Sequence, residues 1–533
     1  MLRNSLYLLK NIFKLKPRLI LLRMLLTTID SIAVFINLIL PKYIISGILN
    51  NQIYWVLKII VAFAAFNILC AFINRISSIY LIKNTESLNI ILIDKFMKDG
   101  FNIPYELYFN QEFFSIYNFN FNNICDIHHN VLDAFINLYA SILNLFLITT
   151  IIKIENYFYI ILFIFILLLV FIREKQNKYE VIRSEESVNS NRKLQYIYSL
   201  FSYPRNIRDM KLKKYSDYIF LKKDKFSEEY IRNYLSDTIP IANLTFISSI
   251  IINLEKFIIL SMFSYLLILK KILIEDFFVY LQAYAETKRT ITRFFDIYTS
   301  LNINNEYIKK LINMKSSMIN KSRKKLDSIE RIDIKNLSFS YNSGNNIISN
   351  FSFEIKKNDR VLITGGNGKG KTTLLYLLIG LIKPNDGLIY FNKDAEINTF
   401  DFNPESCIGV QFQDTNIFPF KISENISLNE KINLTHIKNT RLFDNIYDKL
   451  DLYYSGYFAD DGIDLSGGQK QLIGIMRAIY SNADVVIFDE PFNNLDSTRR
   501  NEVVSYINQM KNNIVIVVTH DYEGFNYNKH IIL

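Results

Sequence analysis

Long apolar runs fill the first three-fifths of the chain, and short alternating runs fill the rest. A bilayer-spanning helix needs about 20 mostly apolar residues. Six segments approach that composition, and we expect each to span a membrane: residues 19–40, 54–73, 131–152, 154–172, 241–269 and 273–295. From residue 329 onward, apolar positions recur with the period of strands. The pattern predicts a polytopic α-helical membrane domain of about six spans, followed by an α/β domain.

Charge placement predicts the orientation of these spans. Lysine and arginine crowd residues 173–240 and the residues before the first span, whereas the opposite loops are short and carry few cations. By the positive-inside rule, the N-terminus, the loops 74–130 and 173–240, and the C-terminal domain are cytoplasmic. Juxtamembrane cations also account for the net charge of +10 without a nucleic-acid partner. We expect a multi-pass protein of the cell inner (cytoplasmic) membrane.

A polar, cationic stretch without apolar periodicity separates the two parts of the chain. It predicts a linker at residues 315–328, between a membrane domain at 1–314 and a second domain at 329–533. The three cysteines have neither metal-site nor disulfide spacing, so we expect inert thiols.

A glycine-rich loop lies between an apolar strand at residues 360–364 and a helical run at 374–379. Such a loop wraps its backbone around phosphate oxygens, and the following helix N-terminus attracts the anion. Lys371 should reach the β- and γ-phosphates of ATP, and the Thr372 hydroxyl should bind Mg²⁺. The context predicts a P-loop NTPase, with nucleotide-binding residues Gly365, Asn367, Gly368, Gly370, Lys371, Thr372 and Thr373.

An acidic pair, Asp489 and Glu490, follows the buried-strand pattern of residues 485–488. Ligands of open α/β sheets bind at the carboxyl ends of strands. A carboxylate there can hold Mg²⁺ or orient the attacking water of a phosphoryl transfer. We expect ATP hydrolysis with Mg²⁺ at this position.

The pentapeptide Leu465-Ser466-Gly467-Gly468-Gln469 lies between the phosphate loop and the acidic pair. With these three motifs the chain resembles the ATP-binding cassette (ABC) family. The resemblance implies that Asp489 binds Mg²⁺, that Glu490 is the catalytic glutamate and that His520 touches the γ-phosphate. It implies that Tyr341 stacks on adenine, although an ordinary strand tyrosine is the alternative. It also implies a glutamine contact with Mg²⁺ or water, for which Gln413 fits the family spacing better than its competitor Gln411.

Glycines and a serine at a helix start form a second anion cradle. In the family, this cradle binds the γ-phosphate held by a second copy. The resemblance assigns that role to Ser466, Gly467 and Gly468, with Gln469 at the interface. We therefore expect a second half-transporter chain as partner. A homodimer would have two complete sites, and a heterodimer with a degenerate partner is the alternative. The asparagines at 493 and 494 replace the family's usual small pair in the D-loop.

A membrane domain fused ahead of one ATPase domain resembles bacterial half-size exporters. The resemblance implies ATP-driven export by alternating access, of a peptide or else a lipid or drug. A membrane ATPase that senses or regulates without transport is the alternative. It also implies coupling helices near residues 105–113 and 207–215, where plain helical hairpins are the alternative. The short lead before the first span predicts no N-terminal protease domain. Because few residues follow His520, we expect the family's final strand pair and C-terminal helix to be shortened or missing.

Charges within or near the expected spans are the remaining candidates: Arg23, Asp30, Glu255 and Lys256. Charged groups at membrane depth usually face a cavity or a partner. Glu255 could line a translocation path and meet a cationic or polar cargo, or it could lie at a span boundary with its side chain reaching the interface.

Overall fold

The computed structural model describes residues 2–101, 103–151, 156–202, 204–211, 213–316, 324–341, 346–366, 368–392, 395–396, 402–403, 407–428 and 444–533. The chain divides into two compact units. One comprises Met1–Phe101 and Ser115–Ser317, and the other Asn102–Phe114 and Met318–Leu533. The division falls inside the expected linker. The short segment Asn102–Phe114 differs from expectation, because it groups with the C-terminal unit.

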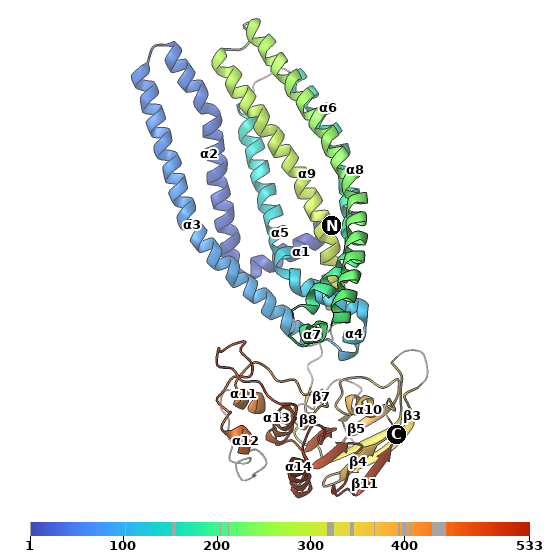
Figure 1. Cartoon of the computed structure of the whole chain (residues 1–533). Helices are drawn as coiled ribbons and strands as arrows, with labels where there is room; N and C mark the ends of the chain where they lie inside the picture. The colour runs from blue at the N-terminus through green and yellow to red at the C-terminus, as the bar shows by residue number, and fades with distance from the viewer. Residues whose placement is uncertain are drawn as a thin grey trace. The chain divides into compact units, whose positions relative to one another are not determined.

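The first unit is helical throughout its described residues. Its helices are α1 (Leu2–Leu15), α2 (Pro17–Leu49), α3 (Ile53–Phe101), α5 (Gln111–Thr149), α6 (Asn156–Leu200), α7 (Pro204–Met210), α8 (Lys213–Ile268) and α9 (Ile274–Ser316). Helices α2 and α3 form a long hairpin, and α6 runs beside α8 (Figure 1). Many apolar side chains on the outer faces of these helices are exposed, such as Ile68 and Phe146. This inverted surface suits a lipid environment.

Among the described residues, four helices are long and apolar enough to cross a membrane. They include the expected spans at 19–40 and 54–73 and nearly all of those at 131–152 and 241–269. The expected span at 154–172 begins outside the described residues and continues into α6. The expected span at 273–295 forms the first half of α9, but charged residues such as Glu286 and Lys288 keep that helix below the same apolar standard.

The second unit contains a parallel and an antiparallel sheet. The parallel sheet has the order β11-β4-β10-β9-β8. Its strands are β11 (Lys529–Ile532), β4 (Arg360–Thr364), β10 (Ile514–Val518), β9 (Val485–Asp489) and β8 (Ile408–Gln411). The antiparallel sheet is ordered β3-β2-β5-β6, with strands β3 (Ile348–Lys356), β2 (Arg331–Phe339), β5 (Asp386–Phe391) and β6 (Ala395–Glu396). A two-stranded pair joins β1 (Lys324–Lys325) to β7 (Phe402–Asn403).

The described residues of this unit also form the helices α4 (Tyr105–Phe109), α10 (Lys371–Leu378), α11 (Ile422–Ser427), α12 (Asp444–Tyr447), α13 (Gly467–Tyr480) and α14 (Ser497–Gln509). The two central parallel strands, β9 and β10, are buried at every position because both of their faces are covered. In β9, Val485 and Ile487 join the core that contains α10. Val486 and Phe488, pointing oppositely, join the core that contains α13 and α14.

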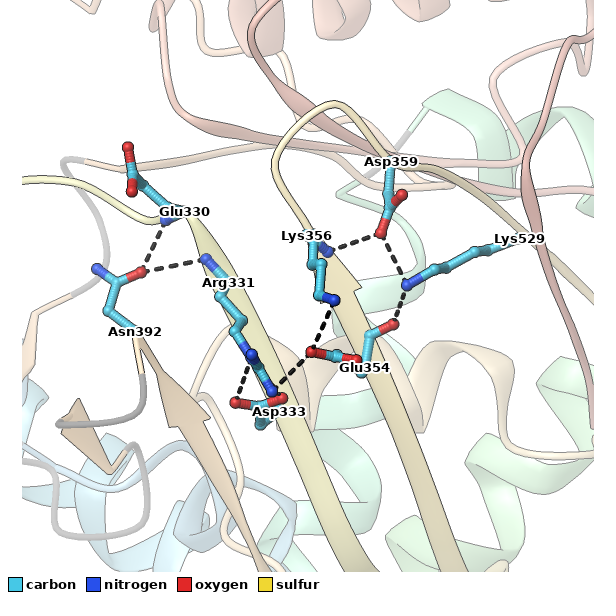
Figure 2. A network of polar contacts seen from close by, with 8 residues as sticks. All are labelled: Glu330, Arg331, Asp333, Glu354, Lys356, Asp359, Asn392 and Lys529. Atoms are coloured by element: carbon cyan, nitrogen blue, oxygen red, sulfur yellow. Dashed lines mark hydrogen bonds and ion pairs between the residues drawn. The ribbon is translucent and has the colours of Figure 1, made fainter.

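An ion-pair network links the edges of the two sheets (Figure 2). Arg331 of β2 pairs with Asp333 at 2.8 Å and with Glu354 of β3 at 2.6 Å. Lys529 of β11 pairs with Asp359 at 2.8 Å and donates to the Glu354 carbonyl oxygen. Burial opposes ionisation of Asp359, but hydrogen bonds from Lys529, the Lys356 amide and Asn528 outweigh it and lower the pKa of this carboxyl. The network therefore holds β11 beside the strand that carries the phosphate loop.

Candidate active site

The phosphate loop runs from β4 into α10, as the sequence predicts. Gly368 and Gly370 have φ angles of 77° and 93°, in the left-handed region that favours glycine. A Cβ on Gly370 would also lie 2.6 Å from Ile347 Cγ2. The loop thus brings the free N–H groups of the α10 N-terminus to a point where they can bind an anion. Asn367 lies outside the described residues, so its contact with the nucleotide stays a prediction.

Lys371 lies across this loop and reaches the next motif. Its Nζ donates to the Gly365 carbonyl oxygen at 2.8 Å and lies 2.8 Å from His520 Nε2. Since an ammonium can only donate, Nε2 is the acceptor and the His520 proton resides on Nδ1. The same Nε2 lies 3.7 Å from Glu490 Oε1. The structure therefore brings Lys371, Glu490 and His520 together, although Lys371 and Glu490 are more than a hundred positions apart in the sequence.

The acidic pair sits at the carboxyl end of β9, next to the phosphate loop. Asp489 is 2% exposed and Glu490 is 8% exposed. Burial, and then the charge of Glu490, raise the pKa of Asp489 to about 6, while Lys371 and the Thr372 hydroxyl pull it down. Both burial and the Glu490 charge disfavour the ionised form of Asp489, and a bound cation would favour it.

The donor set at this position suits Mg²⁺. This ion prefers oxygen ligands and is usually held by one or two carboxylates, water and substrate phosphates. Asp489 and the Thr372 hydroxyl supply two such oxygens, and they interact with each other. No group of three or more His, Cys, Asp or Glu side chains forms a metal cage among the described residues. The site therefore fits an ion that arrives with phosphate oxygens.

Two buried glutamines hold the backbone of the acidic pair, and the sequence analysis missed their structural role. Gln411 Nε2 donates to the Asp489 carbonyl oxygen at 3.1 Å, and Gln471 Nε2 donates to the Glu490 carbonyl oxygen at 2.9 Å. Glu490 has a φ of 48°, which is unfavourable for a residue with a side chain. The Gln471 hydrogen bond helps to hold that conformation.

Gln411 and Gln413 differ in whether the side chain is buried and hydrogen-bonded or exposed to solvent. Gln411 is 1% exposed, and its amide also donates to the Phe412 carbonyl oxygen at 2.7 Å. Gln413 is exposed just beyond the end of β8. A contact with a metal ion or water requires a side chain that can reach the ligand, so the geometry favours Gln413.

Tyr341 lies at the end of β2 with about half of its side chain exposed. Its ring packs on Phe339, and its hydroxyl is 3.4 Å from Thr373 Oγ1 of the phosphate loop. The exposed ring is thus anchored beside the loop, as adenine stacking requires. Phe109 of α4 contacts the same ring, with centroids 6.0 Å apart.

Helix α4 occupies the first segment expected to be a coupling helix. Tyr105 packs edge-on against Tyr376 of α10, and the Glu106 carboxylate accepts a hydrogen bond from the Lys383 amide. The segment that joins α3 to α5 thus contacts the phosphate-loop helix directly. The second expected segment forms α7 within the helical unit.

The serine–glycine motif forms the N-terminus of α13. The Ser466 hydroxyl accepts from the Gln469 amide at 3.3 Å, and Gln469 Oε1 accepts from the Ser466 amide at 3.0 Å. Asn494 lies against both glycines, and a Cβ on Gly468 would come within 2.8 Å of its carbonyl oxygen. Within the described ranges, no hydrogen bond or ion pair links Ser466 or Gln469 to Lys371. Ser466 and Gly467 at this helix start are exposed.

Several charged residues of the helical unit form ion pairs between helices. Glu255 of α8 is 1% exposed and forms an ion pair with Lys288 of α9. The sequence analysis did not identify Lys288 as its partner, and the pair borders a cavity of only about 20 Å³. Arg23 pairs with Asp133 of α5. Glu255 thus forms an interhelical ion pair, and its role in a translocation path stays a prediction.

The sequence of the ATPase unit is similar to those of known proteins. A family profile described as "ABC transporter" matches residues 348–493. The energy-coupling factor transporter ATP-binding protein EcfA1 of Mycoplasmoides gallisepticum is 34% identical, covering 36% of this chain and 70% of that protein. The lacticin-481/lactococcin-DR transport/processing ATP-binding protein lcnDR3 of Lactococcus lactis subsp. lactis is 29% identical, covering 41% of this chain and 32% of that protein.

A solved structure extends the comparison to nearly the whole chain. The structure of a bacterial Atm1-family ABC exporter with ATP bound aligns with a TM-score of 0.76, covering 98% of this chain and 94% of that one. Sequence identity over this alignment is 15%, so the likeness concerns the fold.

Proposed function

We propose that this chain, which belongs to the ABC transporter family, is one half of an ATP-driven exporter whose cargo is a peptide. One observation carries the proposal. Apolar membrane helices and a full set of ATPase motifs occur in a single chain, with a fold like that of an ABC exporter along 98% of its length. ATP binding belongs to the family, and export, cargo and partner are the proposed parts.

The residues at the site divide the work of phosphoryl transfer. Lys371 exchanges its contact with the Gly365 carbonyl for phosphate oxygens, because a charged acceptor forms the stronger hydrogen bond. Thr372, Asp489 and Gln413 would hold Mg²⁺, and the ion would neutralise charge that develops on the phosphates. Glu490 orients the attacking water and accepts proton density, and His520 reaches the γ-phosphate from the Lys371 side. Tyr341 stacks on the adenine ring.

Each ATPase site of the proposed assembly is shared between two chains. Ser466, Gly467 and Gly468 form a helix start that can bind an anion, and Ser466 and Gly467 are exposed. A partner related by two-fold symmetry would supply the phosphate and receive the same contact in return. We propose a homodimer, since this chain carries every hydrolytic motif. A heterodimer would be revealed by an unequal effect of one substitution on the two sites.

Membrane placement follows from the charge distribution. Because cations cluster in residues 173–240 and near the N-terminus, we place these segments and the ATPase unit on the cytoplasmic side of the inner membrane. Contacts of α4 with α10 and Tyr341 support its role as a coupling helix.

The peptide cargo is supported by a named relative. The matching Lactococcus protein is described as a transport and processing protein for lacticin-481, and the match spans about a third of that protein. A lipid or a drug would remain compatible with the fold alone.

The test compares Glu490→Gln with Glu502→Gln, a control carboxylate on the surface of α14. Both variants and the wild type are placed in sealed vesicles with fluorescent peptide, lipid and dye probes. We expect ATP-dependent accumulation of a probe in the wild type and the control, and its loss in Glu490→Gln. Accumulation that is unaffected by Glu490→Gln would contradict ATP-driven export. Turnover of ATP without movement of any probe would favour the regulatory alternative.

A further inference from the structure

The helical unit contains a polar cavity that the ATPase site does not use. It has a volume of about 560 Å³ and is bounded by α2, α5 and α9. This size lies within the range of roughly 300–1,000 Å³ that is typical of ligand pockets. Its lining includes Asp30, Asp133, Asn144, Arg293 and Asp296. Of these residues, Asp30 and Asn144 lie well inside expected spans, where charged and polar groups usually face a cavity or a partner.

Ion pairs within the unit satisfy two of the three carboxylates. Asp133 pairs with Arg23, and Asp296 pairs with Arg173 at 2.9 Å. Asp30 instead accepts a hydrogen bond from the neutral Asn74 amide at 3.1 Å. Within the described part of the chain, neither Asp30 nor Arg293 has an ion-pair partner within 4.0 Å. The cavity therefore presents one anionic and one cationic group whose charges are not paired.

Asn144 is an independent sign of a ligand. It is 7% exposed and lines the cavity, and its Oδ1 has no hydrogen-bond partner among the described residues. An unsatisfied buried acceptor costs about 1–3 kcal/mol. A ligand N–H group would remove that cost, whereas an acyl chain or an apolar ring would not. The acceptor thus favours a ligand that carries an N–H donor over a purely apolar one.

From this combination we propose that the cavity is the cargo site and that it selects a short zwitterionic peptide segment. The cargo ammonium binds Asp30, a carboxylate binds Arg293, and a backbone N–H donates to Asn144 Oδ1. This inference rests on the proposed export function and specifies the chemistry of its cargo. Asp30 and Arg293 determine the preference for each charge, and Asn144 determines the preference for amides.

The experiment measures ATPase stimulation of the full chain in lipid nanodiscs, relative to the basal rate of each variant. The first probe is a short lysine–alanine peptide with free termini. A second has its amino groups acetylated, a third has an amidated C-terminus, and tetraphenylphosphonium carries charge without amides. The variants are Asp30→Asn, Arg293→Gln and Asn144→Leu. Asp94→Asn is the control, because Asp94 lies on the exposed surface of α3 and pairs with Lys98.

We expect the free peptide to stimulate the wild type and Asp94→Asn at concentrations about tenfold lower than the other probes. Asp30→Asn should raise the half-maximal concentration of the free peptide about tenfold, with little change for the acetylated peptide. Arg293→Gln should also raise the half-maximal concentration of the free peptide about tenfold, with little change for the peptide with an amidated C-terminus. Asn144→Leu should raise the half-maximal concentration of every peptide and leave that of tetraphenylphosphonium unchanged.

Equal responses of Asp30→Asn and wild type to both peptides would overturn the inference, as would stronger stimulation by tetraphenylphosphonium or by added phospholipid. In that event, lipid or dye accumulation that still depends on Glu490 would leave the proposed export intact. Loss of that dependence on Glu490 would instead remove the proposed function itself.

Discussion

Protonation of Asp489 should by itself weaken divalent-cation binding at the ATPase site about tenfold when the pH falls from about 7.5 to about 5. Burial, and then the neighbouring Glu490 charge, raise the pKa of Asp489 from 3.8 to about 6. A cation binds the ionised carboxylate. With a pKa near 6, the ionised fraction drops from about 97% to about 9% over this range, whereas with the ordinary value it would stay above about 90%.

The sign of the effect follows from the protonation equilibrium. A carboxylate whose pKa is raised must release a proton before it can bind the cation, so protons compete with the metal below about pH 6. The assay is a Mn²⁺ titration of the full chain with a non-hydrolysable ATP analogue, followed by electron paramagnetic resonance. The nucleotide also titrates in this range, so Asp489→Asn is the matched control that retains the nucleotide's own pH dependence.

The difference between wild type and Asp489→Asn isolates the carboxylate. We expect the two proteins to differ most at pH 7.5 and to converge as the pH approaches 5. A wild-type advantage that is the same at both pH values would show that Asp489 is ionised throughout. It would refute the argument that burial and Glu490 control its charge.

Three other predictions concern the dimer, the acidic pair and the sheet edge. Ser466→Arg should keep ATP binding within about threefold, because the hydrogen bonds of Ser466 in the described residues go to Gln469 and not to the phosphate loop, yet lower steady-state hydrolysis at least about a hundredfold; normal turnover would contradict the shared site. Gln471→Leu should lower kcat more than it changes KM for ATP, because the Glu490 carbonyl loses its 2.9 Å donor; an equal kcat would contradict this positioning role. Lys529→Met should destabilise the ATPase unit by about 1–3 kcal/mol at neutral pH, as judged by thermal unfolding. Because Asp359 has a lowered pKa, this loss should persist above its unfolded pKa near 4 and disappear as the pH falls through the folded value; a loss that does not change with pH would exclude the ion pair as its cause.

The motifs of the ATPase unit could be predicted from sequence because their chemistry is local. The phosphate loop is one continuous segment between a strand and a helix, and its glycines adopt the backbone angles that such a loop requires. The alternation in β9 likewise follows from strand geometry, which sends neighbouring side chains to opposite cores. Apolar runs long enough to span a bilayer can also be predicted from the sequence, because length and composition are properties of a single segment.

The partners of those segments were decided only by tertiary structure. Periodicity could not reveal that Lys288 neutralises Glu255, because the two lie on different helices and 33 positions apart. Nor could spacing show that Gln411 is tied to the Asp489 carbonyl, 78 positions away, while Gln413 remains exposed. Sequence determined which chemical groups the chain carries and the local conformations they favour. Packing determined which of them meet, because an ion pair or a buried amide contact depends on distances between elements, and these arise only when the elements fold against one another.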